Sequence, residues 1–329
     1  MAEVLLVLGT ATGGVGQHVR SLARGLPGQV TVACPASTQQ VFGFPRWVEL
    51  DVGDRPHPAR DLRAILRLRG LARGADLVHA HGLRAGSLAA LAGTSPLVVS
   101  WHNAVDSRLG ARLERLVARR TEVTLAASAD LLATALRAGG RDVRLAPVAA
   151  PALVPTGSDP GLGAPLVLAV GRLHPQKGYD VLLAARAAFG EAVVAVAGDG
   201  PLRAGLVAAA PDVRWLGQRD DVADLLAAAD VVVLPSRWEA RSLTAQQALL
   251  AGRPLVASAG GGLPALLGNG ALLVPPGDPE ALAAAVRSLL DDPAAAAELV
   301  ARGRAVAAGW PDEDATVRQV AAVHAELLG

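Results

Sequence analysis

Several residue types are scarce in this chain of 329 residues. Its one cysteine, Cys34, has no partner for a disulfide within the chain. Aromatic residues make up only 3% of the sequence, and no aromatic-rich basic face or zinc-finger spacing is visible, so we expect no nucleic-acid partner. No run of about 18 apolar residues is free of charges or helix breakers, which excludes an obvious transmembrane helix.

Lysine is the scarcest charged residue. Lys177 is the only one, and the other 30 of the 31 basic residues are arginine. A compact ammonium group on a flexible stem suits a point contact with phosphate, whereas guanidinium is a wide planar fork. Either this position requires lysine, or the residue is a product of drift in a sequence biased toward alanine, arginine and glycine.

The opening residues, "MAEVLLVLGTATGG", lack the basic segment and cleavage signal of a secretory peptide. Together with the unpaired cysteine, they predict a protein of the reducing cytoplasm.

The composition is that of a globular protein, with 51% hydrophobic and 19% charged residues. Its length allows two domains of ordinary size. Residues 1–155 contain 18 arginines against 11 acidic residues, while residues 156–329 contain 13 basic against 19 acidic residues. This asymmetry indicates an anionic partner for the first half.

Short apolar runs alternate with longer helical patterns along most of the chain. Continuous apolar strands separated by helices predict parallel sheets covered on both faces. The pattern stops in a Pro- and Gly-rich segment, residues 146–165, and then restarts. We therefore predict an α/β fold of two doubly wound domains joined by a hinge. The runs that we predict to be strands are residues 4–9, 30–34, 76–81, 97–102, 166–171, 192–198, 213–217, 230–235 and 254–258.

The segment "GTATGGVGQHV", residues 9–19, connects a predicted strand to a helix. Glycines at such a junction let backbone amides approach an anion at the positive end of the helix. The order of the glycines is not that of a dinucleotide-binding fingerprint, and a P-loop lysine is missing. The alternative is a tight strand-to-helix turn without a ligand.

Two further segments place polar residues after buried strands. In "GRLHPQKGYD", Arg172 and Lys177 follow a strand at the edge where open α/β sheets bind ligands, and two cations there would neutralise a diphosphate. In "LPSRWEARSLTAQQALLAGRPLVAS", Glu239 lies between a strand and a helix that begins near Ser242. A carboxylate beside free helix amides fits a sugar phosphate. Solvated loop charges and a carboxylate that complements the helix dipole are the alternatives.

The histidines are weaker candidates. His79 and His81 flank Ala80, and we expect one to point to each side of the strand; His102 ends another strand. Each is more often structural than catalytic. The spacing of cysteine, histidine and acidic residues matches no metal site, and "PDED" near the C-terminus, residues 311–314, is predicted to cap a helix. We expect no bound metal and no cofactor.

Taken together, these segments resemble family 4 of the retaining glycosyltransferases, which have the two-domain GT-B fold. The resemblance runs through nearly the whole chain and is most specific in the second half, in "GRLHPQKGYDVLLAA", "VAGDGPLRAGL" and the segment around Glu239. It implies an N-terminal acceptor-side domain, residues 1–155, and a C-terminal domain that binds the nucleotide sugar, residues 156–309. It also implies a last helix, residues 310–329, that returns to the first domain.

The resemblance also implies roles for the C-terminal site residues. Arg172 and Lys177 would bind the diphosphate and stabilise it as it leaves. Glu239 would hold hydroxyls of the transferred sugar, and backbone amides around Ser242 and Leu243 would meet the phosphate.

In the first half, the resemblance implies that Gly13, Gly14 and Gly16 line a loop facing the donor phosphates and the acceptor. His102 would contact the sugar from the N-terminal domain.

The sequence departs from the family pattern in the donor segment. The pattern has two glutamates eight positions apart, but Gln247 stands eight positions after Glu239. A neutral acceptor for the ribose hydroxyls is weaker than a charged one. Ala265 replaces a usual acid, and residues 146–150 lack the customary Pro-Asn-Gly.

The predicted function is metal-independent, retaining transfer of a sugar from a nucleoside-diphosphate sugar to the hydroxyl of a glycan, lipid or small molecule. The alternatives are a non-catalytic nucleotide-sugar-binding partner protein and a GT-B epimerase. A basic helix with leucines, residues 59–76, suggests peripheral contact with the inner face of the membrane; a solvated helix face is the alternative.

Overall fold

The computed structural model describes residues 2–94, 96–105 and 107–329. Contacts divide the chain into two compact units. Unit 1 comprises Met1–Ala149 together with Pro311–Gly329, and unit 2 comprises Ala150–Trp310. In the described residues, no helix has the length and apolar character needed to span a bilayer.

Unit 1 contains a seven-stranded sheet in the order β3-β2-β1-β4-β5-β6-β7, and every pairing is parallel. The strands are β1 (Glu3–Leu8), β2 (Gln29–Cys34), β3 (Trp47–Glu49), β4 (Leu77–His81), β5 (Leu97–Trp101), β6 (Val123–Ala126) and β7 (Val143–Leu145). The central strands β4 and β5 are buried along their whole length, as expected of a parallel sheet covered on both faces, although β4 carries His79 and His81.

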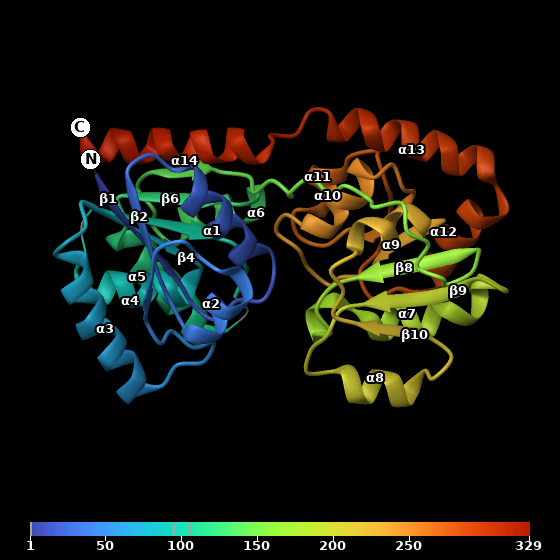
Figure 1. Cartoon of the computed structure of the whole chain (residues 1–329), viewed down its shortest axis with the longest axis horizontal. Helices are drawn as coiled ribbons and strands as arrows, with labels where there is room; N and C mark the ends of the chain where they lie inside the picture. The colour runs from blue at the N-terminus through green and yellow to red at the C-terminus, as the bar shows by residue number, and fades with distance from the viewer. Residues whose placement is uncertain (1, 95, 106) are drawn as a thin grey trace. The chain divides into compact units, whose positions relative to one another are not determined.

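Helices cover both faces of this sheet. They are α1 (Gly14–Gly25), α2 (Ala36–Phe42), α3 (Pro58–Ala72), α4 (Leu83–Ala92), α5 (Arg108–Arg120), α6 (Ala129–Arg137) and α14 (Glu313–Leu328). Val4 and Leu6 of β1 share one core with α1, α2 and α14. Helix α14, red in Figure 1, packs against α1 and β4 although it is the last element of the chain. Unit 1 is therefore built from both ends of the sequence.

Unit 2 contains a six-stranded parallel sheet in the order β10-β9-β8-β11-β12-β13. Its strands are β8 (Leu166–Val170), β9 (Val193–Ala197), β10 (Arg214–Gly217), β11 (Val231–Leu234), β12 (Leu255–Ser258) and β13 (Leu272–Val274). Successive residues of β8 point to opposite faces: Val167 and Ala169 lie in one core cluster, and Leu166 and Leu168 in another.

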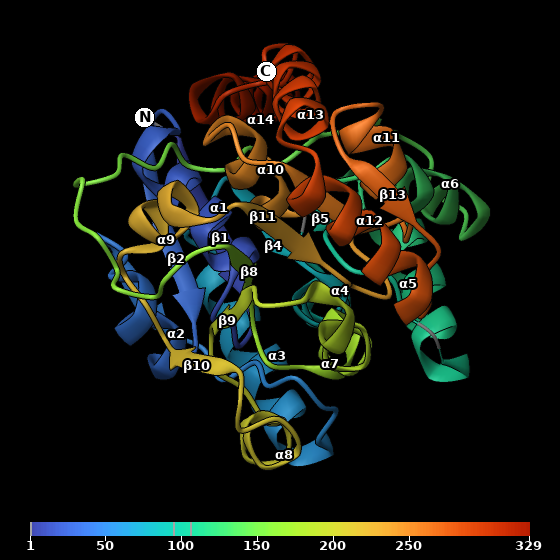
Figure 2. The ribbon, with the colours of Figure 1, turned by 90° about the vertical axis from the view of Figure 1, so that its right-hand side faces the viewer.

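The first of these clusters is covered by α7 and α12, and the second by α9, α10 and α11. Helix α12 packs across β11, β12 and β13 (Figure 2). Asp278 and Asp292 cap the starts of α12 and α13 with their side chains. The helices of unit 2, including the short 3-10 helices η1 and η2, are η1 (Pro175–Lys177), α7 (Tyr179–Ala185), η2 (Arg186–Phe189), α8 (Arg203–Ala209), α9 (Val222–Ala228), α10 (Leu243–Leu250), α11 (Leu263–Leu267), α12 (Pro279–Asp291) and α13 (Pro293–Ala307).

Both sheets reverse their strand order beside their first strand, between β1 and β4 in unit 1 and between β8 and β11 in unit 2. The connections after these strands diverge to opposite faces, which leaves a crevice at the carboxyl edge of the sheet. The predicted class, two doubly wound α/β domains, is confirmed. The glycine loop follows β1, Arg172 and Lys177 follow β8, and Glu239 follows β11, all at these switch points. His102 follows β5, the strand next to β4.

Candidate functional site

The site in unit 2 is built around an ion pair between Lys177 and Glu239. The ammonium Nζ of Lys177 lies 2.5 Å from Oε1 of Glu239. Lys177 ends the 3-10 helix that follows β8, and the chain then turns at Gly178, whose φ is +66°. A Cβ at Gly178 would lie 2.1 Å from the carbonyl oxygen of Pro235. Glycine at position 178 is therefore required both by the left-handed turn and by the close approach of the loop after β11.

Glu239 comes from the loop after β11 and is buried. The hydroxyl of Ser236 donates a second hydrogen bond to Oε1, over 2.8 Å. Both of these bonds fall on Oε1, and among the described residues no donor reaches Oε2. The backbone of Glu239 is held by a parallel bridge to Gly261 and by the amide of Gly262, which donates to its carbonyl over 2.7 Å. One oxygen of a rigidly placed carboxylate is thus left for a ligand.

The loops that carry the pair are clamped together. Arg237 makes two hydrogen bonds to the carboxylate of Asp180, of 2.9 and 2.6 Å. The side-chain amide of Gln176 donates to the carbonyl of Trp238 over 2.8 Å. Bidentate Arg–carboxylate pairs fix geometry as well as charge. The separation of Lys177 and Glu239 is therefore set by contacts outside the pair itself.

Helix α10 begins beside this loop. Ser242 is its N-cap, and the hydroxyl oxygen of Ser242 accepts from the amide of Ala245 over 3.3 Å. Leu243 is the first helical residue. The cap occupies one of the free amides of the first turn, and the others remain available to an anion. Gln247 is half-buried, and its side-chain amide makes no hydrogen bond to the described residues.

Arg172 follows β8 directly and is exposed. Its charge is felt by His174: burial lowers the pKa of this histidine first, and the positive charges of Arg172 and Lys177 lower it further. The pKa of the Tyr179 hydroxyl is raised, by burial and then by the negative charge of Glu239. This hydroxyl donates to the carbonyl of Gly171 over 2.8 Å. Tyr179 and Ser236 support the site, and the sequence alone did not single them out.

The glycine loop of unit 1 follows β1 and leads into α1. Gly13 and Gly14 are exposed, and a Cβ at Gly13 would meet nothing within 4 Å. Gly16 is different, because it is buried and a Cβ there would lie 2.1 Å from the ring of Phe42. The ring of Phe42, from α2, therefore occupies the space that a side chain at position 16 would fill.

Five of the seven histidines gather in unit 1 at the carboxyl edge of its sheet, and all five are buried: His18, His79, His81, His102 and His324. His79 and His81 stack on one another with ring centroids 4.2 Å apart. The expectation that they point to opposite sides was wrong, because residues two apart on a strand face the same side. His18 and His324 were not recognised as members of this group from the sequence.

Burial is the main cause of low pKa values in this group. It lowers the pKa of His18 to about 4 and that of His102 to about 3. The pKa of His81 also lies well below its ordinary value, through burial and then through the neighbouring imidazoles. These three rings are therefore neutral at pH 7.

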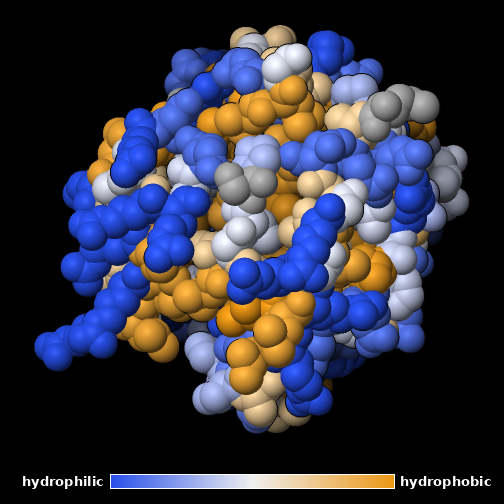
Figure 3. Space-filling model, turned by 90° about the vertical axis from the view of Figure 1, so that its left-hand side faces the viewer, coloured by the Kyte–Doolittle hydropathy of each residue, from blue (hydrophilic) through white to orange (hydrophobic). Residues whose placement is uncertain are grey.

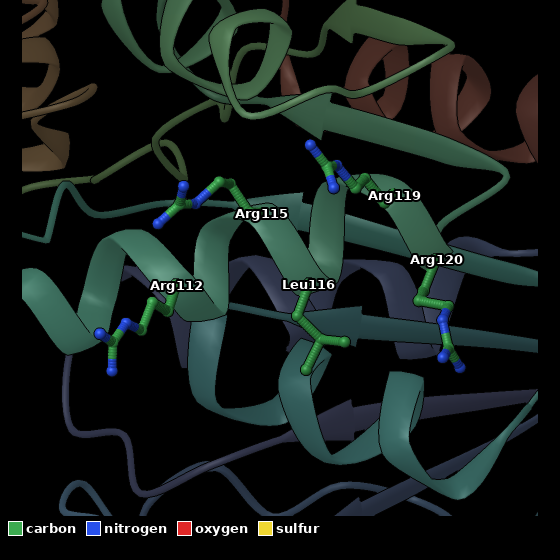
Figure 4. Close-up of a pocket in the computed structure, with 5 residues that line it drawn as sticks. All are labelled: Arg112, Arg115, Leu116, Arg119 and Arg120. Atoms are coloured by element: carbon green, nitrogen blue, oxygen red, sulfur yellow. The ribbon is translucent and has the colours of Figure 1, made fainter.

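Unit 1 also carries a basic surface that the sequence analysis did not identify. Arg112, Arg115, Arg119 and Arg120 surround Leu116 on α5, where they line a hollow of about 340 Å³ (Figure 4). No ion pair joins these arginines to an acidic residue within the described part of the chain.

Helix α3 exposes leucines among its arginines. Leu62 is 58% exposed and Leu66 is 61% exposed, and Arg63 and Arg67 are exposed beside them. Figure 3 shows hydrophobic and hydrophilic side chains intermixed on this side of the molecule. Such a surface combines positive charge with apolar contact area.

Comparisons with known proteins agree with this architecture. Residues 164–292 match the family described as glycosyl transferases group 1, and residues 13–151 match the glycosyl transferase 4-like domain. D-inositol 3-phosphate glycosyltransferase 1 of Catenulispora acidiphila is 32% identical over 342 residues, which cover 87% of this chain and 80% of that protein. Glycogen synthase of Mycobacterium tuberculosis is 40% identical over 151 residues, which cover 42% of this chain but only 36% of that protein.

Among solved structures, Anabaena HepE in complex with UDP-glucose superimposes with a TM-score of 0.87 at 21% identity. The match covers 99% of this chain and 100% of that one. Sucrose-phosphate synthase from Thermosynechococcus elongatus gives a TM-score of 0.77, also at 21% identity, and covers 98% of each chain. At this identity the likeness shows the fold alone. The sequence matches establish that the chain belongs to the group 1 glycosyltransferases, and the structural likeness establishes that it has the GT-B fold.

Proposed function

We propose that this protein is a retaining, metal-independent glycosyltransferase that moves a sugar from a nucleoside-diphosphate sugar to a hydroxyl acceptor. The observation that carries the proposal is the Lys177–Glu239 pair at the switch point of the unit 2 sheet, beside the start of α10. A cation, a carboxylate and free helix amides in one corner match the parts of a sugar diphosphate.

Each group has a distinct task in this proposal. Lys177 has three N–H donors, and one is directed at Glu239, so two remain for diphosphate oxygens. Arg172 supplies a second, exposed cation. The free oxygen of Glu239 accepts hydrogen bonds from sugar hydroxyls, and the amides around Ser242 and Leu243 bind phosphate. Gln247 binds the ribose hydroxyls through its carbonyl, more weakly than the usual glutamate would.

The reaction breaks the bond between the anomeric carbon and the diphosphate oxygen and forms a bond between that carbon and the acceptor oxygen. The departing diphosphate takes the proton of the acceptor hydroxyl, so atoms and charge balance without a dedicated base. Negative charge develops on the phosphate, where Lys177 and Arg172 stabilise it. Removal of one preorganised group of this kind from an active site typically costs several kcal/mol of transition-state stabilisation. We expect each cation here to contribute about that much.

The residues of unit 1 complete the proposal. Backbone amides at Gly13 and Gly14 face the donor phosphates and the acceptor, and His102 contacts the transferred sugar. Gly16 belongs to the same loop, and its packing against Phe42 holds the start of α1 in place.

A non-catalytic nucleotide-sugar binder is the second candidate, and Gln247 is the observation that favours it. Transfer and hydrolysis assays separate the two, because a binder shows saturable affinity for nucleotide sugar without turnover. We expect nucleoside diphosphates to raise the melting temperature, since a ligand that binds only the folded protein stabilises it. A panel of bases and sugars in this assay identifies the donor.

The direct test compares Lys177→Ala with Arg287→Ala, whose guanidinium pairs with Asp291 on the surface of α12. Lys177→Ala is expected to lose transfer and most of the thermal shift by the diphosphate, while the control retains both. Full transfer by Lys177→Ala would exclude the assigned role.

We further propose that unit 1 contacts anionic lipid at the inner face of the cytoplasmic membrane through α3. Exposed Leu62 and Leu66 supply apolar area, and Arg63 and Arg67 supply charge. The unmodified protein is expected to co-sediment with anionic liposomes at low salt. The variant Arg63→Glu/Arg67→Glu is expected to lose this binding. No binding by the unmodified protein, or equal loss in Arg214→Glu/Arg287→Glu, would contradict this contact.

A further inference from the structure

Three histidines from separate connections of unit 1 meet at one point. His18 lies in α1, His81 ends β4, and His102 follows β5. Their ring centroids form a nearly equilateral triangle, with all three separations equal to 5.6 Å. One ring nitrogen of each lies within 4.8 Å of those of the other two. Three rings from separate elements therefore present nitrogens to one common point.

The dimensions suit a small metal ion. With Zn–N bonds of 2.0–2.1 Å in a tetrahedral site, two ligand nitrogens lie about 3.4 Å apart and the ring centres about 5.2 Å apart. Nδ1 of His81 and Nε2 of His102 are 3.3 Å apart and share a hydrogen bond, whose proton a metal would replace. Ligand nitrogens of the three rings lie within 4.8 Å of one another, so the rings must shift by up to about 1.4 Å to reach the tetrahedral spacing.

One ring nitrogen of the cluster lacks a hydrogen-bond partner. Nε2 of His81 is buried, and no group of the described residues bonds to it. His81 itself is only 3% exposed. A buried imidazole nitrogen without a partner is costly. Nε2 is on the opposite edge of the ring from Nδ1, the nitrogen near His102, so the spacing of the three rings is the observation that supports a metal.

The rings are also in the right state to bind a metal. Burial lowers the pKa values of His18, His81 and His102, so that at neutral pH each ring is uncharged and has a lone pair on one nitrogen. The lone pair used in the His81–His102 hydrogen bond becomes available when a metal replaces the shared proton. Neutral imidazole is a common ligand of zinc and of similar first-row metals. Cys34 is fully buried in the β2 core, and the metal site does not include it.

We propose that His18, His81 and His102 form a binding site for a divalent transition-metal ion of the Zn²⁺ or Co²⁺ class. Three nitrogens fill three corners of a tetrahedron, and the fourth corner is open to water or to a ligand oxygen.

Neighbouring side chains hold the cluster in place. His79 stacks on His81, and its own nitrogens bond to Ser100 Oγ over 2.8 Å and to His324 Nε2 over 3.0 Å. His79 is therefore fixed from two sides and supports the ring of His81. Contacts that hold a ligand ring in one orientation raise its affinity for the metal.

The site has a consequence for catalysis that depends on the proposed function. Transfer itself needs no metal, and His102 is the residue we assign to the sugar. A bound metal would occupy His102, so the ion would act as an inhibitor. Zinc would then compete with the donor sugar, and His18→Gln would raise the zinc concentration needed for inhibition. If no transfer activity is found, the metal site can still be measured directly.

The test uses the full chain without a histidine tag, stripped with chelator and titrated with Co²⁺. We expect equimolar binding, the intense visible absorption bands of tetrahedral cobalt, displacement by Zn²⁺ and a rise in melting temperature. Loss of an outer-shell partner costs roughly 10–100-fold in metal affinity, so loss of a ligand in His18→Gln or His102→Gln should cost at least about 100-fold.

His57→Gln and His174→Gln change histidines outside the cluster and are expected to bind cobalt as the unmodified protein does. Circular dichroism verifies that each variant is folded, and His18→Gln on helix α1 keeps the test usable if a strand variant misfolds. Absence of equimolar binding, octahedral spectra, or unchanged affinity in folded His18→Gln and His102→Gln would overturn the site.

Discussion

The Lys177–Glu239 pair should contribute to the stability of unit 2 as well as to function, and the two effects can be separated. The side chain of Glu239 is 10% exposed and that of Lys177 is 20% exposed. In Lys177→Ala, the carboxylate stays buried with only the hydroxyl of Ser236 as a donor. Removal of one partner from a buried pair costs about 3–5 kcal/mol because the other charge is left uncompensated.

The partial exposure of the lysine places the expected cost at the lower end, about 3 kcal/mol. For a unit of this size, each kcal/mol lowers the melting temperature by roughly 2–4 °C, so a decrease of about 6–12 °C follows. Lys177→Met/Glu239→Gln replaces both charges by neutral groups of similar volume. It should therefore be more stable than the summed costs of the single changes Lys177→Met and Glu239→Gln predict, by about 1–3 kcal/mol.

Urea unfolding followed by circular dichroism gives the four free energies of this cycle, and transfer assays on the same proteins give activity. The double variant is expected to recover stability but not activity, because the phosphate cation and the sugar-binding carboxylate are both gone. Costs that add within about 0.5 kcal/mol would refute the coupling. An active double variant would refute the catalytic assignment.

Two further predictions concern unit 1. Gly16→Ala should destabilise it by about 1–3 kcal/mol, because the new methyl group would lie 2.1 Å from the ring of Phe42. The control is Gly13→Ala, because a Cβ at position 13 meets nothing within 4 Å. Equal melting temperatures of the two variants would contradict the packing of Gly16 against Phe42. Burial raises the pKa of the Cys34 thiol to about 12, so a thiol reagent at pH 8 should label it only after unfolding, and rapid labelling of the native protein would show that the β2 core opens.

Most of the fold follows from local patterns in the sequence. The nine predicted strands correspond to β1, β2, β4, β5 and β8–β12, because each is a continuous apolar run bounded by turn residues. The four unpredicted strands are β3, β6, β7 and β13, all of three or four residues. Such short edge or near-edge strands owe their conformation to pairing with a neighbour, which periodicity does not encode.

The site was only partly accessible to sequence reasoning. The position of Lys177 was visible, because it is the only lysine and it follows a buried strand. That its ammonium bonds Glu239, 62 positions away, depends on which strands are neighbours at the switch point. His18 was missed for the same reason: its ring joins His81 and His102 only through the order of the strands. A signal existed in their positions: His81 ends a buried strand, His102 follows one, and His18 lies in the helix after another.

The return of α14 to unit 1 makes that unit discontinuous in sequence. Val317 and Val320 of α14 close the core over α1, whereas unit 2 is one uninterrupted stretch. During synthesis, unit 2 is therefore complete before the ribosome delivers the helix that seals unit 1. Until then the apolar residues of α1 that pack against α14 are uncovered in the nascent first half. This is the stage at which chaperone capture or premature proteolysis would act on this protein.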